Sequence, residues 1–488
     1  MRRAYDVASV RAAEAKLIAE VGDLALMRRA AHGLALTCVR MLDRCYGSRV
    51  TLLVGSGNNG GDTLFAGAEL AQRGVAVTAV RTGSHTHPAG SDALRGAGGR
   101  IVDADDRRAE TAVAGADLLV DGVVGIGGRG TLASRPAHLL EVVAAAGVLV
   151  VAVDVPSGVD SDTGAVEGDA VWADVTVTFG ALKTGLVVAP GALHCGLVEL
   201  VDIGLGPSLV SGPPAVELLD ADDVAALLPE PTAASDKYSQ GVPGIVAGSS
   251  RYPGAAVLAT GAALHAKAGL VRYAGPAADQ VVARWPSAVV VDGPPGSAGQ
   301  VQAWGIGPGI GTDDAAAGRV LDVLGANVAV VVDADALTVV AGDPALRDRI
   351  RARSAATVLT PHDGEFARLA PDLALDPDRV GATSALAQRL QATVLRKGMT
   401  TIVATPGRVT LVNPTGTAWL ANAGTGDVLT GIITAYLAAG LDPHLAVGAA
   451  AFVHGLAGHL AGAGDDQPMT ADQLVDALAP TYELIRRR

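Results

Sequence analysis

The sequence predicts an α/β protein with two domains, each built on a parallel sheet that helices cover on both faces. Three observations predict this fold class. The 488 residues exceed what one hydrophobic core usually organises. Hydrophobic residues make up 49% of the chain and aromatic residues only 3%, which is typical of a globular α/β protein. Short β-branched runs alternate with helical patterns along both halves.

The first half begins with a helical pattern and continues as alternating strands and helices. Residues 7–45 carry Ala, Leu and Val at helical spacing, with charged residues between them. The strands expected after them are 49–54, 75–80, 117–124 and 148–153, and the expected helices are 62–73 and 135–146. Because such strands pair in parallel, their carboxyl ends meet at one edge of the sheet.

A Gly/Pro/Ser-rich stretch at residues 204–214 interrupts this pattern, and a new series of strands and helices begins after it. We therefore expect one domain over residues 1–212 and a second over residues 216–488. In the second half we expect strands at 244–247 and 328–332, helices at 253–269 and 376–391, and further helices from Asp427 onward.

The charge and the cysteines exclude several classes of protein. The net charge of −13 offers no broad basic surface, so we expect neither nucleic acid nor an anionic membrane as a partner. A signal peptide is not expected, because no uninterrupted apolar segment follows the basic start. The longest apolar stretch, residues 144–153, is about half of what a membrane helix needs. The scattered thiols of Cys38, Cys45 and Cys195 indicate a reducing compartment without structural zinc, so we expect a cytoplasmic protein.

A glycine-rich loop follows the first expected strand. Residues 55–62 read GSGNNGGD and satisfy the G-x-G-x-x-G pattern of Rossmann dinucleotide sites, in which the backbone approaches a pyrophosphate. A glycine turn without a ligand fits the local pattern too. Where an NAD site ordinarily has an acidic residue for the ribose, this chain has Arg81, which suits a 2′-phosphate. The Asn-Asn-Gly-Gly-Asp core also supplies amide oxygens that can bind a hard cation.

Two aspartates end later strands of the same half. Asp121 precedes a second glycine loop, and Asp154 precedes the run VPSGVD at 155–160. All three loops follow strands of one parallel sheet, so we expect them to meet in one crevice at its carboxyl edge. A carboxylate such as Asp154 can move a proton there. The alternative is that Asp154 is only a helix N-cap.

These motifs, together with TFGALKTGL at 178–186, resemble the NAD(P)H-hydrate epimerase family over about residues 1–210. The resemblance implies a Rossmann-like three-layer domain, with Asp154 as the catalytic carboxylate and a potassium ion held by Asn59, Asp121 and Ser157. It implies contact with the hydrated dinucleotide by Asn58, Asn59, Gly60, Gly61, Asp62, Gly125, Ile126, Gly127, Gly128, Arg129, Gly130, Thr131 and Asp154.

The chain departs from this family at two places. Thr63 stands where the family usually has glycine, and the loop after Asp121 reads GVVGIGGRG rather than a DALLGTGL-like sequence. Lys183, within TFGALKTGL, is either part of the site or a solvated charge.

A loop of small residues precedes an apolar helix in the second half, where residues 421–431 read ANAGTGDVLTG. Backbone amides at such a helix N-terminus can bind an anion, and Asp427 is placed to take a proton from an alcohol that attacks a phosphate. Upstream, residues 396–401 (RKGMTT) supply a cation and hydroxyls for nucleotide phosphates. The pattern indicates phosphoryl transfer without a Walker loop.

Five further segments resemble the ADP- or ATP-dependent NAD(P)H-hydrate dehydratases, over about residues 216–488. They are DKYSQG (236–241), YPGAA (252–256), GIGPGIG (305–311), DADAL (333–337) and LTPHDGEF (359–366). The resemblance implies a ribokinase-like domain and Mg²⁺ on the nucleotide phosphates. It implies contact with the hydrate by Ala256, Gly309, His362 and Asp427, and with the nucleotide by Lys397, Gly398, Met399, Thr400, Thr401 and Gly426. Asp363 stands where the family often has proline.

Structural roles remain as alternatives for several of these residues. His362 can be a turn histidine, Glu365 an acid at a helix N-terminus, and GIGPGIG a connecting turn. His454 and His459, on one apolar helix, are expected to be packed rather than to bind a metal, because no third ligand accompanies them.

The sequence thus predicts an enzyme that repairs hydrated nicotinamide cofactor. The first domain interconverts the R and S hydrates, NADHX or NADPHX, and the second dehydrates the S form at the expense of ADP or ATP. Asp427 is the expected base of that second reaction. We also expect a homo-oligomer. The alternative is a ribokinase-like small-molecule kinase fused to a non-catalytic Rossmann-like binding domain.

Overall fold

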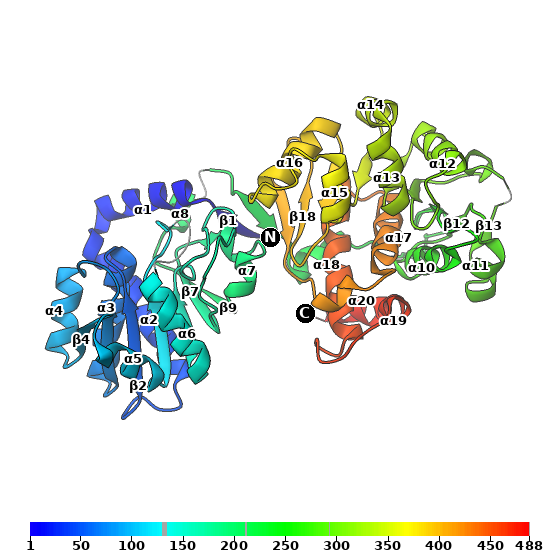
Figure 1. The fold of residues 1–488 in the computed structure, drawn as a ribbon. Coiled ribbons are helices and arrows are strands. Elements are labelled where there is room, and N and C mark those ends of the chain that lie inside the picture. The colour runs from blue at the N-terminus through cyan, green and yellow to red at the C-terminus, as the bar shows by residue number, and fades with distance from the viewer. Residues whose placement is uncertain (129–133, 210–211, 292, 488) are drawn as a thin grey trace. The chain divides into compact units, whose positions relative to one another are not determined.

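The computed structural model describes residues 1–128, 134–209, 212–291 and 293–487 (Figure 1). The chain divides into two compact units. One is Arg3–Val216, and the other combines Met1–Arg2 with Glu217–Arg488. We call them the N-terminal and the C-terminal unit. Both are built on sheets with mainly parallel strands, which confirms the predicted α/β class.

The sheet of the N-terminal unit has seven strands, all paired in parallel, in the order β4-β3-β2-β5-β6-β7-β9. The order changes direction between β2 and β5, which is where open α/β sheets bind ligands. The strands are β2 (Arg49–Val54), β3 (Ala76–Arg81), β4 (Arg100–Asp103), β5 (Leu118–Gly122), β6 (Leu149–Val153), β7 (Val175–Phe179) and β9 (Leu197–Val201). A separate parallel pair joins β1 (Arg2–Tyr5) to β8 (Leu182–Lys183), with Tyr5 opposite Lys183.

Helices cover both faces of this sheet, so consecutive residues such as Leu52 and Leu53 are both fully buried. The helices are α1 (Val7–Val21), α2 (Asp23–Met41), α3 (Asn58–Gln72), α4 (Pro88–Gly96), α5 (Arg107–Ala114), α6 (Ser134–Ala146), η1 (Thr184–Leu186), α7 (Gly191–His194) and α8 (Gly206–Leu209).

Two of the predicted helices differ from the structure. The helical pattern over 7–45 forms two helices, because Gly22 has a φ of 85° and ends α1. Helix α3 begins at Asn58, four residues before the predicted start at Asp62, because Gly57 provides the extended residue that precedes it. The whole Asn-Asn-Gly-Gly-Asp core therefore lies in the first turns of a helix.

The sheet of the C-terminal unit runs β13-β12-β11-β14-β15-β16-β17-β18-β19, with β10 beyond β19. Its pairs are parallel from β13 to β17 and antiparallel from β17 to β19. The strands are β10 (Val216–Leu218), β11 (Pro243–Val246), β12 (Arg272–Tyr273), β13 (Val289–Val290), β14 (Ala303–Ile306), β15 (Ala329–Val332), β16 (Thr357–Leu359), β17 (Thr393–Arg396), β18 (Thr401–Ala404) and β19 (Thr410–Asn413).

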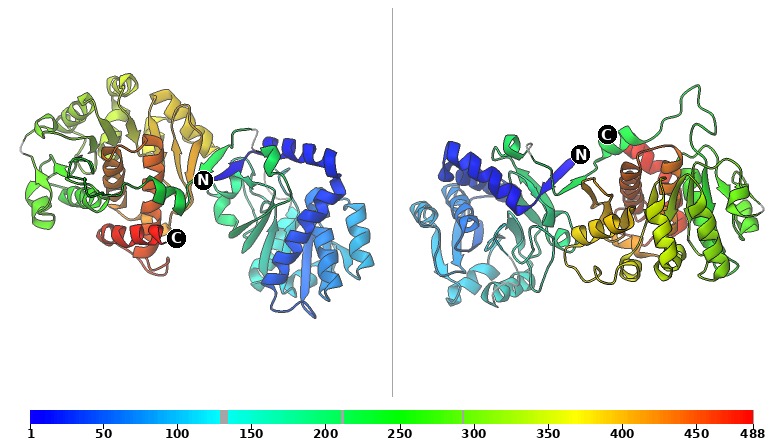
Figure 2. Two further views of the ribbon diagram at one scale, coloured as in Figure 1. Left: turned by 180° about the vertical axis from the view of Figure 1, so that it is seen from behind. Right: turned by 90° about the horizontal axis from the view of Figure 1, so that it is seen from above.

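Apolar helices form the core of this unit, and α17 and α18 lie side by side in Figures 1 and 2. Helix α18 is long and apolar enough to cross a membrane, but 72% of its apolar window is buried inside the protein, as in a core helix. The helices are α9 (Ala221–Leu227), α10 (Pro253–His265), α11 (Ala278–Arg284), η2 (Pro295–Ser297), α12 (Asp314–Gly325), α13 (Ala334–Gly342), α14 (Pro344–Ala352), α15 (Asp363–Leu369), α16 (Arg379–Leu390), η3 (Ala418–Ala421), α17 (Thr425–Ala438), α18 (Pro443–Ala461), α19 (Ala471–Asp476) and α20 (Leu478–Arg486).

Candidate active sites

A cavity of about 570 Å³ lies at the carboxyl edge of the N-terminal sheet, beside the change of direction between β2 and β5. The loops after β2, β5 and β6 line it together with α1 and α2. Of the predicted site residues, those that line it are Asn58, Asn59, Asp62, Gly125, Ile126, Gly127 and Asp154. The three loops thus meet in one crevice, as the sequence predicted.

The other predicted residues of this site lie around the cavity or outside the described residues. Gly60 and Gly61 are buried within α3. Gly128 lines a smaller neighbouring cavity of about 120 Å³. Arg129, Gly130 and Thr131 lie outside the described residues, so their predicted contacts stay predictions.

Asp154 lies at the end of β6 and forms a buried ion pair. Its Oδ1 accepts hydrogen bonds from the Lys183 ammonium and, at 3.2 Å, from the Thr178 hydroxyl. Lys183 is only 1% exposed, so it is not a solvated charge. Asp154 has a φ of 68°, and no helix begins between it and β7, so the N-cap alternative is wrong. Asp154 lies at the wall of the cavity.

Further acidic groups surround Asp154. Glu14 of α1, Asp23 of α2 and Asp62 of α3 all line the same cavity. Burial raises the pKa of Asp62 well above its usual range, and the negative charges of Asp154, Glu14 and Asp23 raise it further. Burial, followed by the charge of Asp154, also raises the pKa of Glu14. The cavity therefore favours the neutral form of some of its carboxyl groups.

The three predicted potassium ligands lie next to this cavity. Asp121 is fully buried, and its oxygens accept hydrogen bonds from the Ser157 hydroxyl at 2.7 Å and the Ser157 backbone N–H at 2.8 Å. In the described part of the chain Asp121 has hydrogen-bond donors but no cationic partner. Burial raises its pKa to about 6, because the charged form lacks such a partner.

Asn59 contributes an unsatisfied group to the same place. Its Nδ2 is buried without a hydrogen-bond partner. Its side chain contacts the loop after β5, since a Cβ atom added at Gly125 would lie 3.0 Å from Asn59 Oδ1. An amide, a carboxylate and a hydroxyl are hard donors that suit a potassium ion better than a transition metal.

A second cavity, of about 540 Å³, lies in the C-terminal unit at the N-terminus of α17. The loop after β17, the first turn of α15 and residues of α18 complete its walls. Of the predicted residues, those that line it are His362, Lys397, Gly398, Met399, Thr401, Gly426 and Asp427. Most residues predicted to contact nucleotide thus share one cavity with His362 and Asp427, two of the four predicted to contact the hydrate.

Three predicted residues do not border this cavity. Ala256 is fully buried in α10, and Thr400 is 3% exposed. Gly309 has a φ of 65° and packs on the start of α10, where a Cβ atom would lie 3.0 Å from those of Tyr252 and Ala255. GIGPGIG is therefore more than a free connecting turn, because it packs tightly on the beginning of α10.

Asp427 and Lys397 belong to a network of charges centred on Asp333. Asp333, at the end of β15, is 1% exposed and accepts hydrogen bonds from Lys397 Nζ at 2.8 Å and from Thr430 Oγ1 at 2.7 Å. Burial raises the pKa of Asp427 to about 7, and the negative charge of Asp333 adds to this shift. A carboxyl group with a pKa near neutrality is suited to proton transfer.

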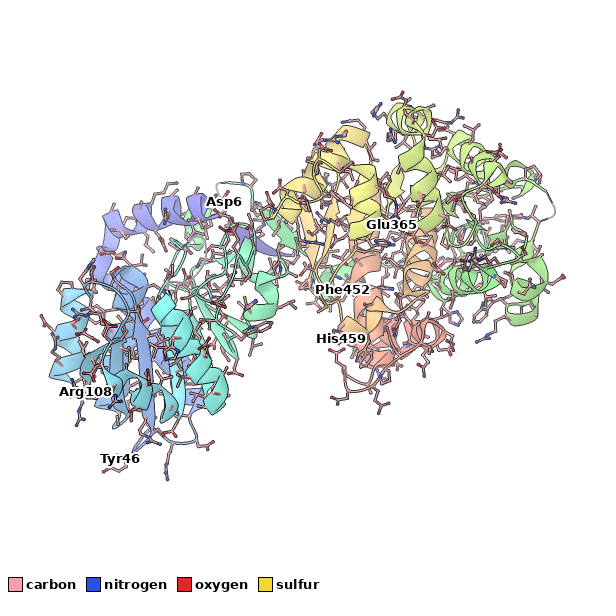
Figure 3. The ribbon with its side chains drawn as sticks, viewed as in Figure 1. Asp6, Tyr46, Arg108, Glu365, Phe452 and His459 are labelled. Atoms are coloured by element: carbon pink, nitrogen blue, oxygen red, sulfur yellow. The ribbon has the colours of Figure 1, made fainter. Side chains whose placement is uncertain are left out.

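His362 and Glu365 form a capping box at the start of α15. His362 Nδ1 accepts the backbone N–H of Gly364 at 3.0 Å, and Glu365 Oε2 accepts the backbone N–H of His362 at 2.8 Å. Glu365, labelled in Figure 3, also lies 3.7 Å from Lys397 Nζ. The structural alternatives for these two residues therefore hold, yet both side chains also line the cavity.

Asp363 connects this turn to the loop after β17. Its carboxylate accepts hydrogen bonds from Arg396 Nε at 2.8 Å and from Arg379 Nη1 at 2.9 Å. Burial alone would raise the pKa of Asp363, but these two hydrogen bonds lower it overall. The Arg396 guanidinium also lies 4.1 Å above the ring of Phe366.

His454 of α18 fixes the loop that precedes Asp427. Its Nε2 lies 2.8 Å from the Thr425 carbonyl oxygen, so the ring donates a hydrogen bond through Nε2. The Thr425 hydroxyl in turn donates to the carbonyl oxygens of Leu420 and Asn422. Burial lowers the pKa of His454 to about 4, which keeps the ring neutral at ordinary pH. His454 is thus packed, as predicted, but against the site.

Similarity to known proteins extends over nearly the whole chain. The chain is 50% identical over 446 residues to the bifunctional NAD(P)H-hydrate repair enzyme Nnr of Mycobacterium tuberculosis (strain ATCC 25618 / H37Rv), and the match covers 90% of each chain. It is 48% identical over 485 residues to the enzyme of that name from Mycobacterium leprae (strain TN), with 97% of this chain and 98% of that one covered. The chain belongs to this family of bifunctional NAD(P)H-hydrate repair enzymes. The predicted family is confirmed.

Family models agree with this assignment. A model described as NAD(P)H-hydrate dehydratase matches residues 243–480, and one described as YjeF-related protein N-terminus matches residues 23–185. The ADP/ATP-dependent NAD(P)H-hydrate dehydratase from Bacillus subtilis, co-crystallised with ATP and Mg²⁺, is 30% identical to this chain. That match covers 55% of this chain and 99% of the other, with a TM-score of 0.49.

Several charged residues at or beside the repair enzyme's cavities were not predicted as site residues, among them Arg11, Glu14 and Asp23 as well as Lys183 and Asp333. Lys183 was left undecided, although a lysine that follows a buried strand within a glycine-rich motif is a signal of a buried charge. Asp333 lies in the quoted DADAL motif but received no role. The sequence feature that could have identified Asp333 is its position as an acidic residue directly after the apolar strand β15, at the same sheet edge as the other site loops.

Proposed function

We propose that each unit of the repair enzyme carries one of its two activities. The N-terminal unit epimerises the R and S hydrates of NAD(P)H in the cavity that contains Asp154. The C-terminal unit dehydrates the S hydrate in the cavity that contains Asp427, at the expense of ADP or ATP. The observation that carries the proposal is that the two cavities lie in separate units: one contains Asp154, which pairs with the buried Lys183, and the other contains Asp427 together with the Lys397–Asp333 ion pair.

The epimerase chemistry requires proton transfer at a hydroxyl on the carbon beside the ring nitrogen. The Asp154 carboxylate is available for this transfer, and Lys183 holds it in place from the buried side. The residues fit a potassium ion, because Asn59, Asp121 and Ser157 carry side-chain oxygens, which are hard ligands, and the buried Asp121 has no cationic side chain beside it in the described residues. Such an ion would balance the charge of Asp121 and stabilise the loop after β5.

The dehydratase chemistry requires a base for the hydroxyl of the hydrate and cations for the phosphates. Asp427 is the proposed base, since its pKa of about 7 permits it to accept a proton near neutral pH. Lys397, oriented by Asp333, supplies a positive charge, and the N-terminus of α17 presents backbone amides. Mg²⁺ would neutralise nucleotide phosphates, and the carboxylate of Glu365 at the cavity is a suitable oxygen donor. Phosphate is a better leaving group than hydroxide, so phosphorylation of the hydroxyl favours its elimination.

One experiment tests both assignments. The purified protein is incubated with a mixture of hydrate epimers and with ADP or ATP, in the presence of K⁺ and Mg²⁺, and reduced cofactor is followed by absorbance. Asp154→Asn should leave conversion of the S form intact and stop consumption of the R form. Asp427→Asn should stop formation of reduced cofactor while the epimers still equilibrate. Accumulation of a phosphorylated small molecule without reduced cofactor would instead support the small-molecule kinase.

The proposal also covers the phosphate donor, the cellular localisation and the oligomeric state. The free thiols of Cys38, Cys45 and Cys195 support a cytoplasmic enzyme. A homo-oligomer stays a prediction, which light scattering after size-exclusion chromatography measures directly. The same assay, run with ADP and ATP separately and with NADHX and NADPHX, determines the preferred donor and substrate.

A further inference from the structure

A chain of hydrogen bonds leads from the buried side of α17 to the lysine of the C-terminal cavity. Thr430 is buried in α17 and does not border the cavity. Its hydroxyl donates to Oδ2 of Asp333 at 2.7 Å, and Oδ1 of the same carboxylate accepts from Lys397 Nζ at 2.8 Å. Each oxygen of Asp333 therefore has its own donor, one from the helix and one from the loop after β17.

The hydroxyl of Thr430 bonds differently from that of Thr434, one turn later. A threonine inside a helix often donates to a carbonyl oxygen one turn earlier in the same helix. Thr434, which is also buried in α17, does so and donates to the Thr430 carbonyl oxygen at 2.6 Å. Thr430 instead donates to a carboxylate that directly follows β15, so its hydrogen bond fixes α17 to the end of that strand.

The ammonium group of Lys397 lies at the first turn of α17. A Cβ atom added at Gly426 would be 3.4 Å from Lys397 Nζ and 3.8 Å from Asp333 Oδ2. A cation is unfavourable at a helix N-terminus, because the positive end of the helix dipole lies there. The carboxylate of Asp333 offsets this repulsion at hydrogen-bond distance, whereas that of Glu365 lies 3.7 Å away. The position of Asp333 therefore fixes the position of the ammonium.

We propose that Thr430 is a positioning residue of the dehydratase, which acts through Asp333 to hold the Lys397 ammonium at the first turn of α17. The inference rests on the proposed dehydratase function and adds a residue to it. Asp427 precedes Thr430 by three residues, so both lie on one side of α17. One helix thus carries the proposed base and the hydroxyl that anchors the cation, and it sets the distance between them.

This arrangement matters when phosphate is transferred to the hydrate. As the hydroxyl of the hydrate attacks the terminal phosphate, its proton passes to Asp427, and the bond from phosphorus to the bridging oxygen breaks and leaves its electron pair on the nucleotide. An ammonium that is already in position stabilises this charge without reorganisation. Without the Thr430 hydroxyl, Oδ2 of Asp333 loses its donor and the carboxylate can turn, so the ammonium is in position less often.

The test compares Thr430→Val with the wild-type enzyme, and Thr434→Val is the matched control. Valine keeps the shape of threonine and removes the hydroxyl, and both residues are buried in the same helix. Purified S hydrate is incubated with ADP or ATP, and reduced cofactor is followed by absorbance. Thermal unfolding shows that each variant is folded. Thr430→Ala, which also lacks the hydroxyl, replaces Thr430→Val if the valine variant does not fold.

We expect Thr430→Val to lower kcat by roughly 10- to 100-fold, with less than about a threefold change in KM for the nucleotide. KM changes less because the backbone amides of α17 still bind the nucleotide in the ground state. Thr430→Ser keeps the hydroxyl and should restore most of the rate. Thr434→Val should keep the wild-type kcat.

A double variant tests whether Thr430 acts through Asp333. If it does, the two substitutions are not independent, and Thr430→Val should lower kcat much less in an Asp333→Asn enzyme than in the wild type. A residue that merely stabilises the fold would give the same loss of kcat in both.

Four outcomes would overturn the inference. Folded Thr430→Val could keep the wild-type kcat. Thr430→Ser could lose as much activity as Thr430→Val, which would assign the effect to packing. Thr434→Val could lose as much as Thr430→Val, which would assign it to α17 in general. The loss could be equal in the Asp333→Asn enzyme. A wild-type enzyme that forms no reduced cofactor from the S hydrate with either nucleotide would contradict the proposed dehydratase function itself, so the two failures are distinguishable.

Discussion

The ammonium group of Lys183 donates a hydrogen bond to Oδ1 of Asp154, and the two side chains are only 1% and 10% exposed. Lys183 also donates to the Thr178 hydroxyl at 3.0 Å and to the Phe179 carbonyl oxygen at 2.9 Å. The ammonium therefore has three acceptors, and the carboxylate has a fixed position at the wall of the N-terminal cavity. A buried ion pair of this kind makes each partner dependent on the other.

Removal of one partner should reveal this dependence. Lys183→Met leaves the Asp154 carboxylate buried without a cation, so we expect the free energy of unfolding of the N-terminal unit to fall by about 3–5 kcal/mol. Epimerisation should fall by roughly 10²-fold or more, because Asp154 loses its orientation. Urea denaturation and the epimer assay measure the two effects.

The double variant provides the control for this prediction. Lys183→Met with Asp154→Asn removes both charges, so it should be more stable than Lys183→Met alone. If Lys183→Met unfolds at the same urea concentration as the wild type, the pair does not stabilise the fold.

Potassium should affect one activity of the enzyme and not the other. The fully buried Asp121 has no cationic partner in the described residues, and Asn59 Oδ1 lies against Gly125 in the loop that follows its strand. We expect the rate of epimerisation to rise with KCl and not with choline chloride at equal ionic strength. Asn59→Ala should shift the half-saturating K⁺ concentration upward by about tenfold or abolish saturation. The dehydratase rate of the same sample, on purified S hydrate, is the internal control, and a parallel rise in both rates would contradict the assignment.

The sequence predicted the site loops well because their positions follow from topology. Strands of a parallel sheet end at one edge, so Asp154 and the loops 55–62 and 125–128 had to meet once the strands were recognised. The start of α3 was missed by four residues, since Asn and Gly disfavour helices and only the packing of α3 between sheet and α2 overrides that preference. The break at Gly22 was missed because a single glycine also occurs inside helices, so the sequence pattern alone does not show that α1 ends there.

Side-chain partners were harder to predict than loops. No local pattern joins Asp154 to Lys183, which lie 29 residues apart, or Asp333 to Lys397, which lie 64 residues apart. Asp333 and Lys397 meet because β15 and β17 end at one edge of their sheet, whereas Lys183 reaches Asp154 from β8, which pairs with β1 outside the seven-stranded sheet. The unsatisfied amide of Asn59 and the burial of Asp121 likewise depend on packing that sequence spacing does not contain.

The raised pKa of Asp427 gives two pH effects of opposite sign. The base must be ionised, so kcat/KM of the dehydratase should rise with pH up to and through about 7. In the unfolded chain this carboxyl group has its ordinary pKa of 3.8, so the folded state holds the proton more tightly between that pH and about 7. The contribution of Asp427 to the free energy of unfolding therefore decreases as the pH rises over this range.

Asp427→Asn checks both effects in one protein. We expect its dehydratase rate to be roughly 10²- to 10⁴-fold lower at every pH, without the rise near neutrality. The variant should gain stability relative to the wild type at pH 8 and show little difference at pH 4, as measured by thermal unfolding. A wild-type profile that is flat between pH 5.5 and 8.5 would show that Asp427 does not limit the reaction.

His454 should connect the stability of the C-terminal unit to the affinity for nucleotide. Its neutral ring donates to the Thr425 carbonyl at the N-terminus of α17, and burial lowers its pKa to about 4. The unfolded chain takes up a proton near pH 6.5, so the stability that His454 provides is present above that pH and is lost as the pH falls toward 4.

His454→Leu removes the hydrogen-bond donor and should lower the free energy of unfolding by about 1–3 kcal/mol at pH 7.5. Because the Thr425 loop then loosens, KM for the nucleotide should rise more than kcat falls. His454→Gln can still donate a hydrogen bond and should retain more of the affinity; equal losses in both variants would assign the effect to packing rather than to this hydrogen bond.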